Sequence, residues 1–371
     1  MTPARNVDTR TNLLGLPESQ LRKYFADIGE KPFRARQVLQ WIHQRNAVTF
    51  EEMTDLSKPL RSQLNSAASI QLPAVISEQT STDGTVKWLF ESGAGQAVES
   101  VFIPEPGRGT LCISSQVGCA LDCSFCATGA QGFNRNLGVD EIIGQVAHAN
   151  RNLPRRTSGE PAISNVVFMG MGEPLANYRN VIPALQILLS DFAYGLSRRR
   201  ITVSTSGIVP QLEKLGDDCN VSLAVSLHAP DDALRDVLVP INRVHPIADL
   251  LAACWRYAAK RANRFITFEY VMLRDVNDSL QHADKLATLL KGRPAKINLI
   301  PFNPFAGNDY ERSRTRTIEQ FQGRLRQRGL VATTRRTRGD DIDAACGQLA
   351  GKVRDRVRVR LSEKGRKTAT L

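Results

Sequence analysis

The sequence contains no long apolar run. No segment of its 371 residues approaches the roughly 18 consecutive apolar residues that a membrane-spanning helix needs. The first residues, MTPARNVDTRTNLLGL, lack the apolar stretch of a secretory signal peptide. The sequence also has no internal repeat and no low-complexity linker. We therefore expect a globular, cytoplasmic protein, in which 42% apolar residues allow a large buried core.

Cysteine is scarce as well, with seven in the whole chain. These are too few and too clustered for the disulfide framework of a secreted protein. Three of them, Cys119, Cys123 and Cys126, fall within eight residues in GCALDCSFCATG, and no fourth follows just beyond. Clustered thiols of this kind are more often ligands or reactive groups than structural cross-links.

Negative charge is sparse at the C-terminal end. The chain carries a net charge of +12, and residues 312–371 contain 17 Lys and Arg against 6 Asp and Glu. The basic runs at 312–317, 324–328, 335–338 and 354–360 alternate with small or apolar residues, which is typical of faces of folded elements. A solvated basic surface is the simple interpretation, but such a concentration favours a polyanion such as nucleic acid.

Hydrophobic periodicity divides the chain into parts. Apolar residues spaced by three and four predict helices at 17–28, 32–44 and 50–64, which would form a small N-terminal module. Residues 74–104 alternate like strands in TVKWLFES and QAVESVFIP, which indicates a small β extension.

From about residue 109 strand and helix patterns alternate. The candidate strands are TLCISSQV, ISNVVFMG, RITVSTS, NVSLAVSL, FITFEYVML and KINLIPF. Six βα units predict an α/β fold with a parallel sheet, in which function collects where the strands end. The cysteine triplet follows the first strand, and GMGEP, STSG, SLHAP and PFNP follow the second, third, fourth and sixth.

The three thiolates fit two kinds of metal site. A structural zinc site usually has four ligands, and the nearest fourth candidate is Cys112, seven residues upstream. An iron-sulfur cubane held by three cysteines leaves one iron open, and CxxxCxxC after a first strand is the spacing of radical S-adenosylmethionine (SAM) enzymes. The open iron chelates the amino and carboxylate groups of SAM, which the cluster then cleaves to a 5′-deoxyadenosyl radical. This explains the missing cysteine.

The other strand-end motifs suit the same ligand. Gly172 allows close backbone approach, and Glu173 could accept the ammonium of SAM, although a plain turn with a solvated Glu has the same pattern. Ser204, Ser226 and Asn303 could bind carboxylate, ribose or adenine, although such residues are more often turns or helix caps.

Seven motifs together resemble one family, the dual-specificity ribosomal and transfer RNA adenine-C2 methyltransferases of the radical SAM class. They are VESVFIP, GTLCISSQVGCALDCSFCATG, FMGMGEPL, STSGIVP, AVSLHAP, NLIPFNP and RGDDIDAACGQLAG, and they extend from about 97 to 351. The N-terminal helices also resemble the RNA-binding appendage of that family.

The resemblance implies a role for each site residue. It implies that Cys119, Cys123 and Cys126 hold a [4Fe-4S] cluster, and that Cys346, Cys112 and Glu99 are catalytic. The implied contacts to SAM are Gly172, Glu173, Ser204, Ser226, Leu227, His228 and Asn303.

The resemblance also implies a mechanism with two SAM molecules per turnover. Adenine C2 is an electron-poor carbon without a lone pair, so it needs a radical route. In the family the Cys346 thiolate takes a methyl group, a radical removes hydrogen from that methyl, and the methylene adds to C2. Loss of the C2 proton to Glu99 and attack by Cys112 on the Cys346 sulfur release the RNA and leave a disulfide.

Each of these residues also has an ordinary interpretation. Cys112 could be a core residue of a buried strand, Cys346 a small residue on a helix, and Glu99 an exposed strand residue. We assign Cys219 and Cys254 to the core.

The expected architecture is a radical-SAM partial (βα)6 barrel with additions. We expect a helical RNA-binding module at 1–72, a β extension at 73–108, the barrel at 109–340 and a basic segment with the methyl-accepting cysteine at 341–371. The expected partners are ribosomal RNA, tRNA modified next to the anticodon, and an electron donor such as flavodoxin with its reductase. We expect a monomer that does not bind membranes.

Two other functions stay open. The related C8 adenine methyltransferases, which confer antibiotic resistance, share the five cysteines, although the N-terminal module and the GDDIDAACGQLAG context favour C2. A non-catalytic, metal-stabilised RNA-binding protein is the alternative from another class.

Overall fold

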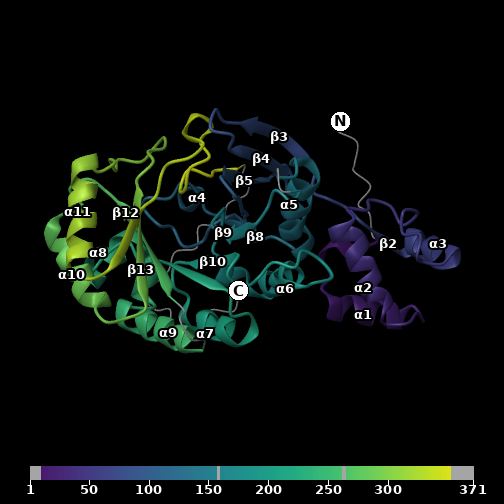
Figure 1. The fold of residues 1–371 in the computed structure, drawn as a ribbon. Helices are drawn as coiled ribbons and strands as arrows, with labels where there is room; N and C mark the ends of the chain where they lie inside the picture. Colours follow the sequence, from purple (N-terminus) through teal and green to yellow (C-terminus); the bar gives the residue numbers. More distant parts are fainter. Residues whose placement is uncertain (1–9, 157–158, 261–264, 352–371) are drawn as a thin grey trace.

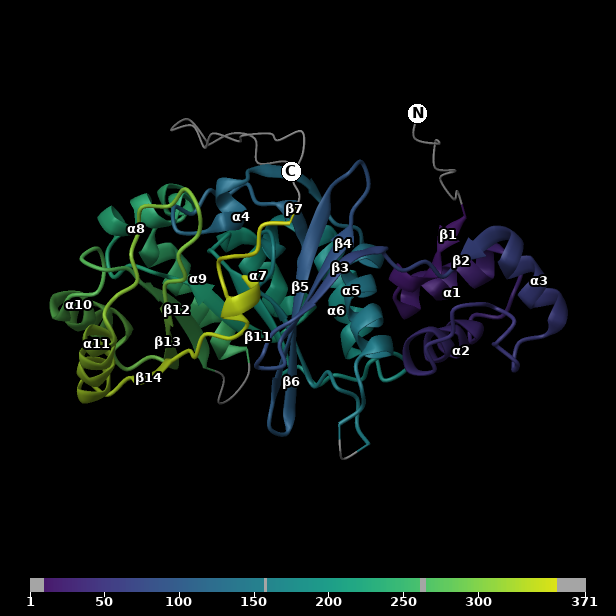
Figure 2. The same ribbon diagram turned by 90° about the horizontal axis from the view of Figure 1, so that it is seen from above.

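The computed structural model describes residues 10–156, 159–260 and 265–351. A large curved sheet has helices along its outer side, and a smaller helical module lies beside it (Figure 1). Seen from above, the chain after the last strand crosses the inner side of the sheet towards β5 (Figure 2). The basic run expected at 354–360 lies outside the described residues.

The main sheet has ten strands in the order β14-β13-β12-β11-β10-β9-β6-β5-β4-β3. All neighbours from β6 to β14 pair parallel, whereas β3, β4, β5 and β6 pair antiparallel. The strands are β3 (Val75–Thr80), β4 (Val86–Glu91), β5 (Ala97–Glu105), β6 (Arg108–Cys112), β9 (Asn165–Phe168), β10 (Ile201–Thr205), β11 (Ser222–Ser226), β12 (Ile266–Met272), β13 (Ala295–Pro301) and β14 (Val331–Thr334). The six predicted parallel strands are all present, which confirms the partial barrel.

The sheet differs from the sequence prediction at both ends. The parallel part has a seventh strand, β14, which pairs with β13. It was not predicted, because the largely exposed sequence VATT does not carry a strong strand pattern. The β extension is not a separate unit, since β5 pairs with β6 and opposes Val101 to Cys112. An unpredicted strand, β3, whose residues are all exposed, forms the far edge.

Helices connect the parallel strands and bury one face each against the sheet. They are α5 (Val139–Asn152), α6 (Tyr178–Leu189), α7 (Val209–Asp218), α8 (Asp232–Leu238), α9 (Ile247–Ala259), α10 (Leu280–Leu290) and α11 (Thr315–Gln327). In α5, for example, Ile142, Val146 and Ala149 recur at helical spacing and are buried. Glu141 begins this helix by accepting a hydrogen bond from the amide of Gly138 at 2.9 Å.

The N-terminal module contains α1 (Glu18–Asp27), α2 (Arg34–Leu39), a π-helical turn (Gln40–Gln44) and α3 (Lys58–Ala67). The first two predicted helices are confirmed, but the prediction of one helix over 50–64 is wrong. The Ser57 hydroxyl accepts from the amide of Leu60 and so begins α3 eight residues later than 50. Met53 and Leu56 are also buried, but they lie in turns that precede α3.

A short parallel pair, β1 (Thr11–Asn12) and β2 (Ala68–Ser69), closes this module. The module meets the barrel at α5, where the Asn12 amide donates to Asp140 at 3.1 Å. No helix in the described part of the chain is long and apolar enough to cross a bilayer.

Two smaller features complete the fold around the inner side of the sheet. A hairpin of β7 (Gln116–Gly118) and β8 (Phe133–Asn136) carries the short helix α4 (Ala127–Ala130) in its loop. The turn between β3 and β4 clasps the C-terminal segment: the Ser81 hydroxyl donates to Asp341 at 2.5 Å, and the Gly339 amide donates to Asp83 at 3.2 Å.

Candidate active site

The three clustered cysteines lie on the loop between β7 and α4. Gly118 begins this loop with a φ of +75°, and its α-carbon lies so close to the Gly132 carbonyl that a side chain would collide with it. The Cys119 amide donates to the same carbonyl at 2.9 Å, and the Cys126 amide donates to Cys123 at 3.1 Å. The backbone therefore fixes all three residues on one compact loop.

The electrostatics of these thiols suit a cationic ligand. Burial raises the pKa of Cys119 well above its usual value and that of Cys123 to about 12, and the neighbouring cysteine is the next cause in both. The raised pKa values favour the neutral thiols, so a cation beside them is needed to hold these groups as thiolates. No three His, Cys, Asp or Glu side chains among the described residues are arranged to hold one metal ion.

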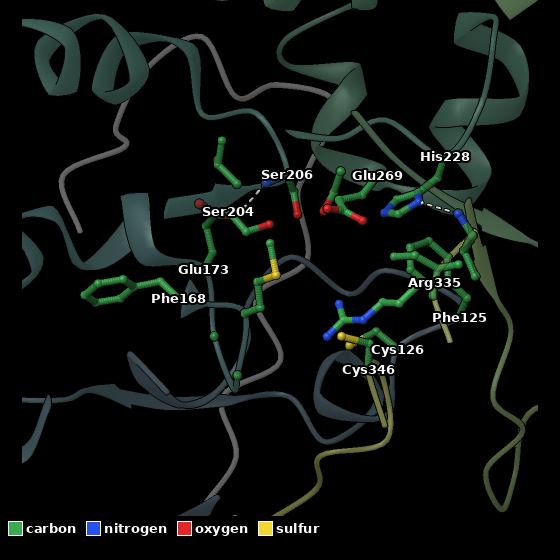
Figure 3. A pocket seen from close by; sticks show the side chains of 18 of the residues that line it. Phe125, Cys126, Phe168, Glu173, Ser204, Ser206, His228, Glu269, Arg335 and Cys346 are labelled. Atoms are coloured by element: carbon green, nitrogen blue, oxygen red, sulfur yellow. Dashed lines mark hydrogen bonds between the residues drawn. The ribbon is translucent and has the colours of Figure 1, made fainter. Parts of the chain in front are cut away.

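A cavity of about 160 Å³ opens where the parallel strands end, beside the cysteine loop. Figure 3 shows that its lining comes from residues far apart in sequence, with Glu173 on one side and Cys346, Arg335 and His228 on the other. The lining includes the predicted residues Cys126, Gly172, Glu173, Ser204, Ser226, His228 and Cys346. The strand-end motifs are thus brought together.

Glu173 is buried in the cavity wall. Its carboxylate accepts hydrogen bonds from the amides of Leu175 at 3.0 Å and Ser206 at 2.8 Å. Burial raises its pKa, and the Ser206 hydrogen bond opposes that rise. Gly172, with a φ of +93°, lies against the Gln116 side chain, so no larger residue fits there. A buried carboxylate of this kind is suited to an ammonium group.

His228 presents a neutral imidazole to the cavity. Burial and the nearby Arg235 lower its pKa to about 3. Its Nδ1 accepts from the Val271 amide at 3.0 Å, so the proton is on Nε2, and its ring packs edge-on against Phe125. Leu227, the adjacent predicted contact, is fully buried and does not line the cavity.

Asn303 and the segment around Cys346 lie together. The Asn303 amide donates to the Cys346 carbonyl at 3.3 Å, while its own Oδ1 is buried and has no hydrogen-bond partner among the described residues. The segment is held from two further sides, because the Ala127 amide donates to Gly347 at 2.9 Å and the Thr128 hydroxyl donates to Leu349 at 2.6 Å. Cys346 therefore sits directly beside the cysteine loop.

Cys112 and Cys346 are close enough to interact electrostatically. Cys112 is buried at the end of β6, and burial together with the charge of Cys346 raises its pKa to about 12. Glu99, on the neighbouring strand, accepts from the Ala350 amide at 2.9 Å and lies 3.5 Å from the ammonium of Lys87. All three residues that the resemblance implies are catalytic thus lie near the C-terminal segment.

Sequence reasoning missed two charged residues in the cavity wall. The guanidinium of Arg335 points at Cys346 (Figure 3), and the charge of Cys346 raises its pKa against the effect of burial. Glu269 is buried on β12, where burial raises its pKa and Asn298 donates to it at 2.8 Å. Glu269 could have been found from sequence, because an acidic residue stands in the middle of the apolar strand FITFEYVML. Arg335 belongs to the basic run at 335–338, and nothing in that run distinguishes it from an exposed arginine.

Comparison with known proteins gives two family matches. Residues 11–70 match the ribosomal RNA large subunit methyltransferase N-terminal domain, and residues 113–287 match the radical SAM superfamily. A crystal structure of a radical SAM methyltransferase from Sphaerobacter thermophilus is 44% identical, with a TM-score of 0.85, over 91% of this chain and 99% of that one. A domain of a pyruvate-formate lyase-activating enzyme from Bacteroides vulgatus is 20% identical, with a TM-score of 0.38, over 47% of this chain and 99% of that one.

Proposed function

Because the chain belongs to the radical SAM ribosomal RNA methyltransferases, which use a [4Fe-4S] cluster and SAM, we propose that it methylates C2 of one adenosine in large-subunit ribosomal RNA and of the adenosine next to the anticodon in tRNA. The observation that carries this proposal is that Cys112, at the end of β6, lies close enough to interact electrostatically with Cys346, which lines the cavity. A second pair of thiols has no part in holding a cluster, but it suits a methyl carrier and its release.

The residues present fit both cofactors. Cys119, Cys123 and Cys126 would hold the cluster, and Gly172, Glu173, Ser204, Ser226, His228 and Asn303 would hold SAM. Leu227, which is buried and does not line the cavity, would support these residues from behind. The unpaired Oδ1 of Asn303 and the buried Glu173 carboxylate are acceptors that the amino groups of SAM can satisfy. When bound, the two cofactors supply a methyl group and the means to remove a hydrogen atom from it.

Cys346 would carry the methyl group to the base. Its setting supports this, because Cys346 lines the cavity and the cationic Arg335 guanidinium points at it (Figure 3). After the methyl-derived carbon has bonded to C2, Cys112 would attack the Cys346 sulfur. Cys112 gives up its thiol proton, a sulfur-sulfur bond forms, and the carbon-sulfur bond breaks with its electron pair going to carbon. That carbon takes up a proton to become the methyl group, and the two sulfurs are oxidised to a disulfide.

Glu99 would accept the proton that C2 loses. In the structure its carboxylate is engaged by the Ala350 amide and by Lys87. Movement of the C-terminal segment would free the first of these acceptor positions when the base enters. The same movement would carry Cys346 between the cavity and the RNA.

Exposed arginines in the basic C-terminal region support RNA as the substrate. Arg314 and Arg316 are exposed at the start of α11, and Arg336 is exposed beside the cavity that also contains Cys346. Such side chains can neutralise phosphates and position the RNA without reading its sequence.

Replacement of Cys112 by alanine tests the proposal. Cys112→Ala should still accept the methyl group and bond to the base, but it should then stall with RNA attached to Cys346. Denaturing gels should show a slower, nuclease-sensitive species, which Cys112→Ala combined with Cys346→Ala lacks. Normal turnover by Cys112→Ala without attached RNA would refute the release mechanism, and mass spectrometry of the product nucleoside would distinguish C2 from C8.

A further inference from the structure

A fully buried arginine lies beneath the cavity without a carboxylate partner. Arg235 on α8 has no exposed surface and forms no ion pair with any carboxylate in the described part of the chain. Its nearest acids are Asp232 and Asp236 on the same helix, but their carboxylates accept from the amide of Asn242 at 2.9 and 2.6 Å. The guanidinium is therefore left with neutral acceptors.

Those acceptors belong to the loops that line the cavity. Arg235 donates from Nη2 to the carbonyls of Ser206 at 2.6 Å and Ser226 at 3.0 Å, and from Nε to Leu227 at 3.1 Å. Its Nη1 donates to Asn242 at 2.8 Å. One side chain thus ties the end of β10 to the end of β11, where the predicted SAM contacts lie.

The charge of Arg235 is compensated only in part, because Asp232 and Asp236 favour its charged form without forming an ion pair with it in the described part of the chain. A buried ion without a counter-ion is costly, because neutral dipoles replace water only in part. Burial lowers the pKa of Arg235 to about 10, so it remains a cation at neutral pH. Among the groups that favour its charged form Cys123 comes first, ahead of Asp232.

The link from Arg235 to Cys123 is also structural. Ser206, whose carbonyl Arg235 holds, contributes a side-chain hydrogen bond to Cys123 and an amide hydrogen bond to Glu173. Arg235 therefore supports both Cys123 and Glu173, the proposed ammonium acceptor, through the same neighbour.

We propose that Arg235 is a positioning residue that supplies the counter-charge for the iron-sulfur cluster and so raises its reduction potential. This inference rests on the proposed function, in which Cys123 is a cluster ligand. Thiolate ligands outweigh the positive charge of a cubane core, and one-electron reduction makes the whole more negative. A fixed cation in a poorly solvated site stabilises the reduced form more than the oxidised form.

The test compares reconstituted holoprotein of the wild type with Arg235→Gln in an anaerobic redox titration. Dithionite is the reductant, and electron paramagnetic resonance measures the reduced cluster. At one applied potential the ratio of reduced to oxidised cluster should fall by about tenfold or more in Arg235→Gln. Arg235→Lys keeps the charge but not the fork of donors, so its ratio should stay near that of the wild type while its affinity for SAM falls. Arg256→Gln, an exposed position paired with Glu213, is the matched control and should leave both unchanged.

A second variant leaves Arg235 in place. Asp236→Asn keeps an oxygen for Asn242 but removes a negative charge beside Arg235, so the ratio of reduced to oxidised cluster should rise. The Asp236→Asn measurement tests whether charge at Arg235 affects the reduction of the cluster even if Arg235→Gln does not fold. An unchanged ratio in Asp236→Asn, or in folded Arg235→Gln, would overturn the inference. If the wild type itself held no iron, the ligand assignment in the proposed function would fail instead.

Discussion

Removal of one hydroxyl should loosen the segment that carries Cys346. Thr128 and Leu349 are both buried, and the Thr128 hydroxyl donates to the Leu349 carbonyl at 2.6 Å. Thr128→Val keeps the shape but leaves that carbonyl unpaired, which costs about 1–3 kcal/mol. Because only the docked segment makes this bond, its opening equilibrium should rise by about 5-fold to 150-fold while the rest of the protein keeps its stability.

Hydrogen exchange measures that opening directly. The Ala350 amide donates to Glu99 and the Ala127 amide donates to Gly347, so both are protected only while the segment is docked. Their exchange should accelerate by the same factor in Thr128→Val. Thr288→Val is the matched control, because its hydroxyl donates to a carbonyl within an exposed helix turn. Unchanged exchange at Ala350 in folded Thr128→Val would refute the argument that this bond holds the segment.

Three further predictions concern other parts of the molecule. Gly172→Ala should lower the melting temperature by several degrees, since a φ of +93° and contact with Gln116 leave no room for a side chain. For RNA binding, Arg316→Gln should reduce the slope of log affinity against log salt by about 0.7 to 0.9, while Arg256→Gln should not; binding that ignores salt would contradict a phosphate contact. Burial lowers the pKa of His43 from 6.5 to about 3, so the unfolded chain binds the proton first and the free energy of unfolding should fall as the pH drops from 6.5 towards 3. Measurement of the melting temperature at a series of pH values should show this fall, and the dependence on pH should be weaker in His43→Gln.

The strand-end motifs were predictable because parallel sheets place successive loops on one edge. Buried apolar runs marked six strands, so Glu173, Ser204 and Ser226 could be assigned to one site from the strand pattern, whereas His228 was assigned to it only through the family resemblance. The limits of the elements were less predictable. Nothing in the apolar spacing of 50–64 shows that Ser57 begins the helix, because that depends on a single side-chain cap.

The charged residues behind the cavity were not predictable from local sequence. Arg235 and Arg335 have the same neighbours in sequence as many exposed arginines, and only the folded chain turns them inward. Arg335 stands in the run RRTR, where Arg336 is exposed and Arg335 reaches the cavity. Strand β14 decides this difference, since it ends directly before Arg335.

The contact between the β3–β4 turn and the C-terminal segment determines which parts of the fold can form first during translation. The bond between Ser81 and Asp341 joins residues 260 positions apart, so the turn leaves the ribosome long before its partner exists. The barrel strands up to β13 can pair while the turn still faces water. Cys346 can be seated only after Asp341 has been translated, so a chain that stopped after β14 would contain the three clustered cysteines and most of the cavity lining, but neither Arg335 nor the proposed methyl carrier Cys346.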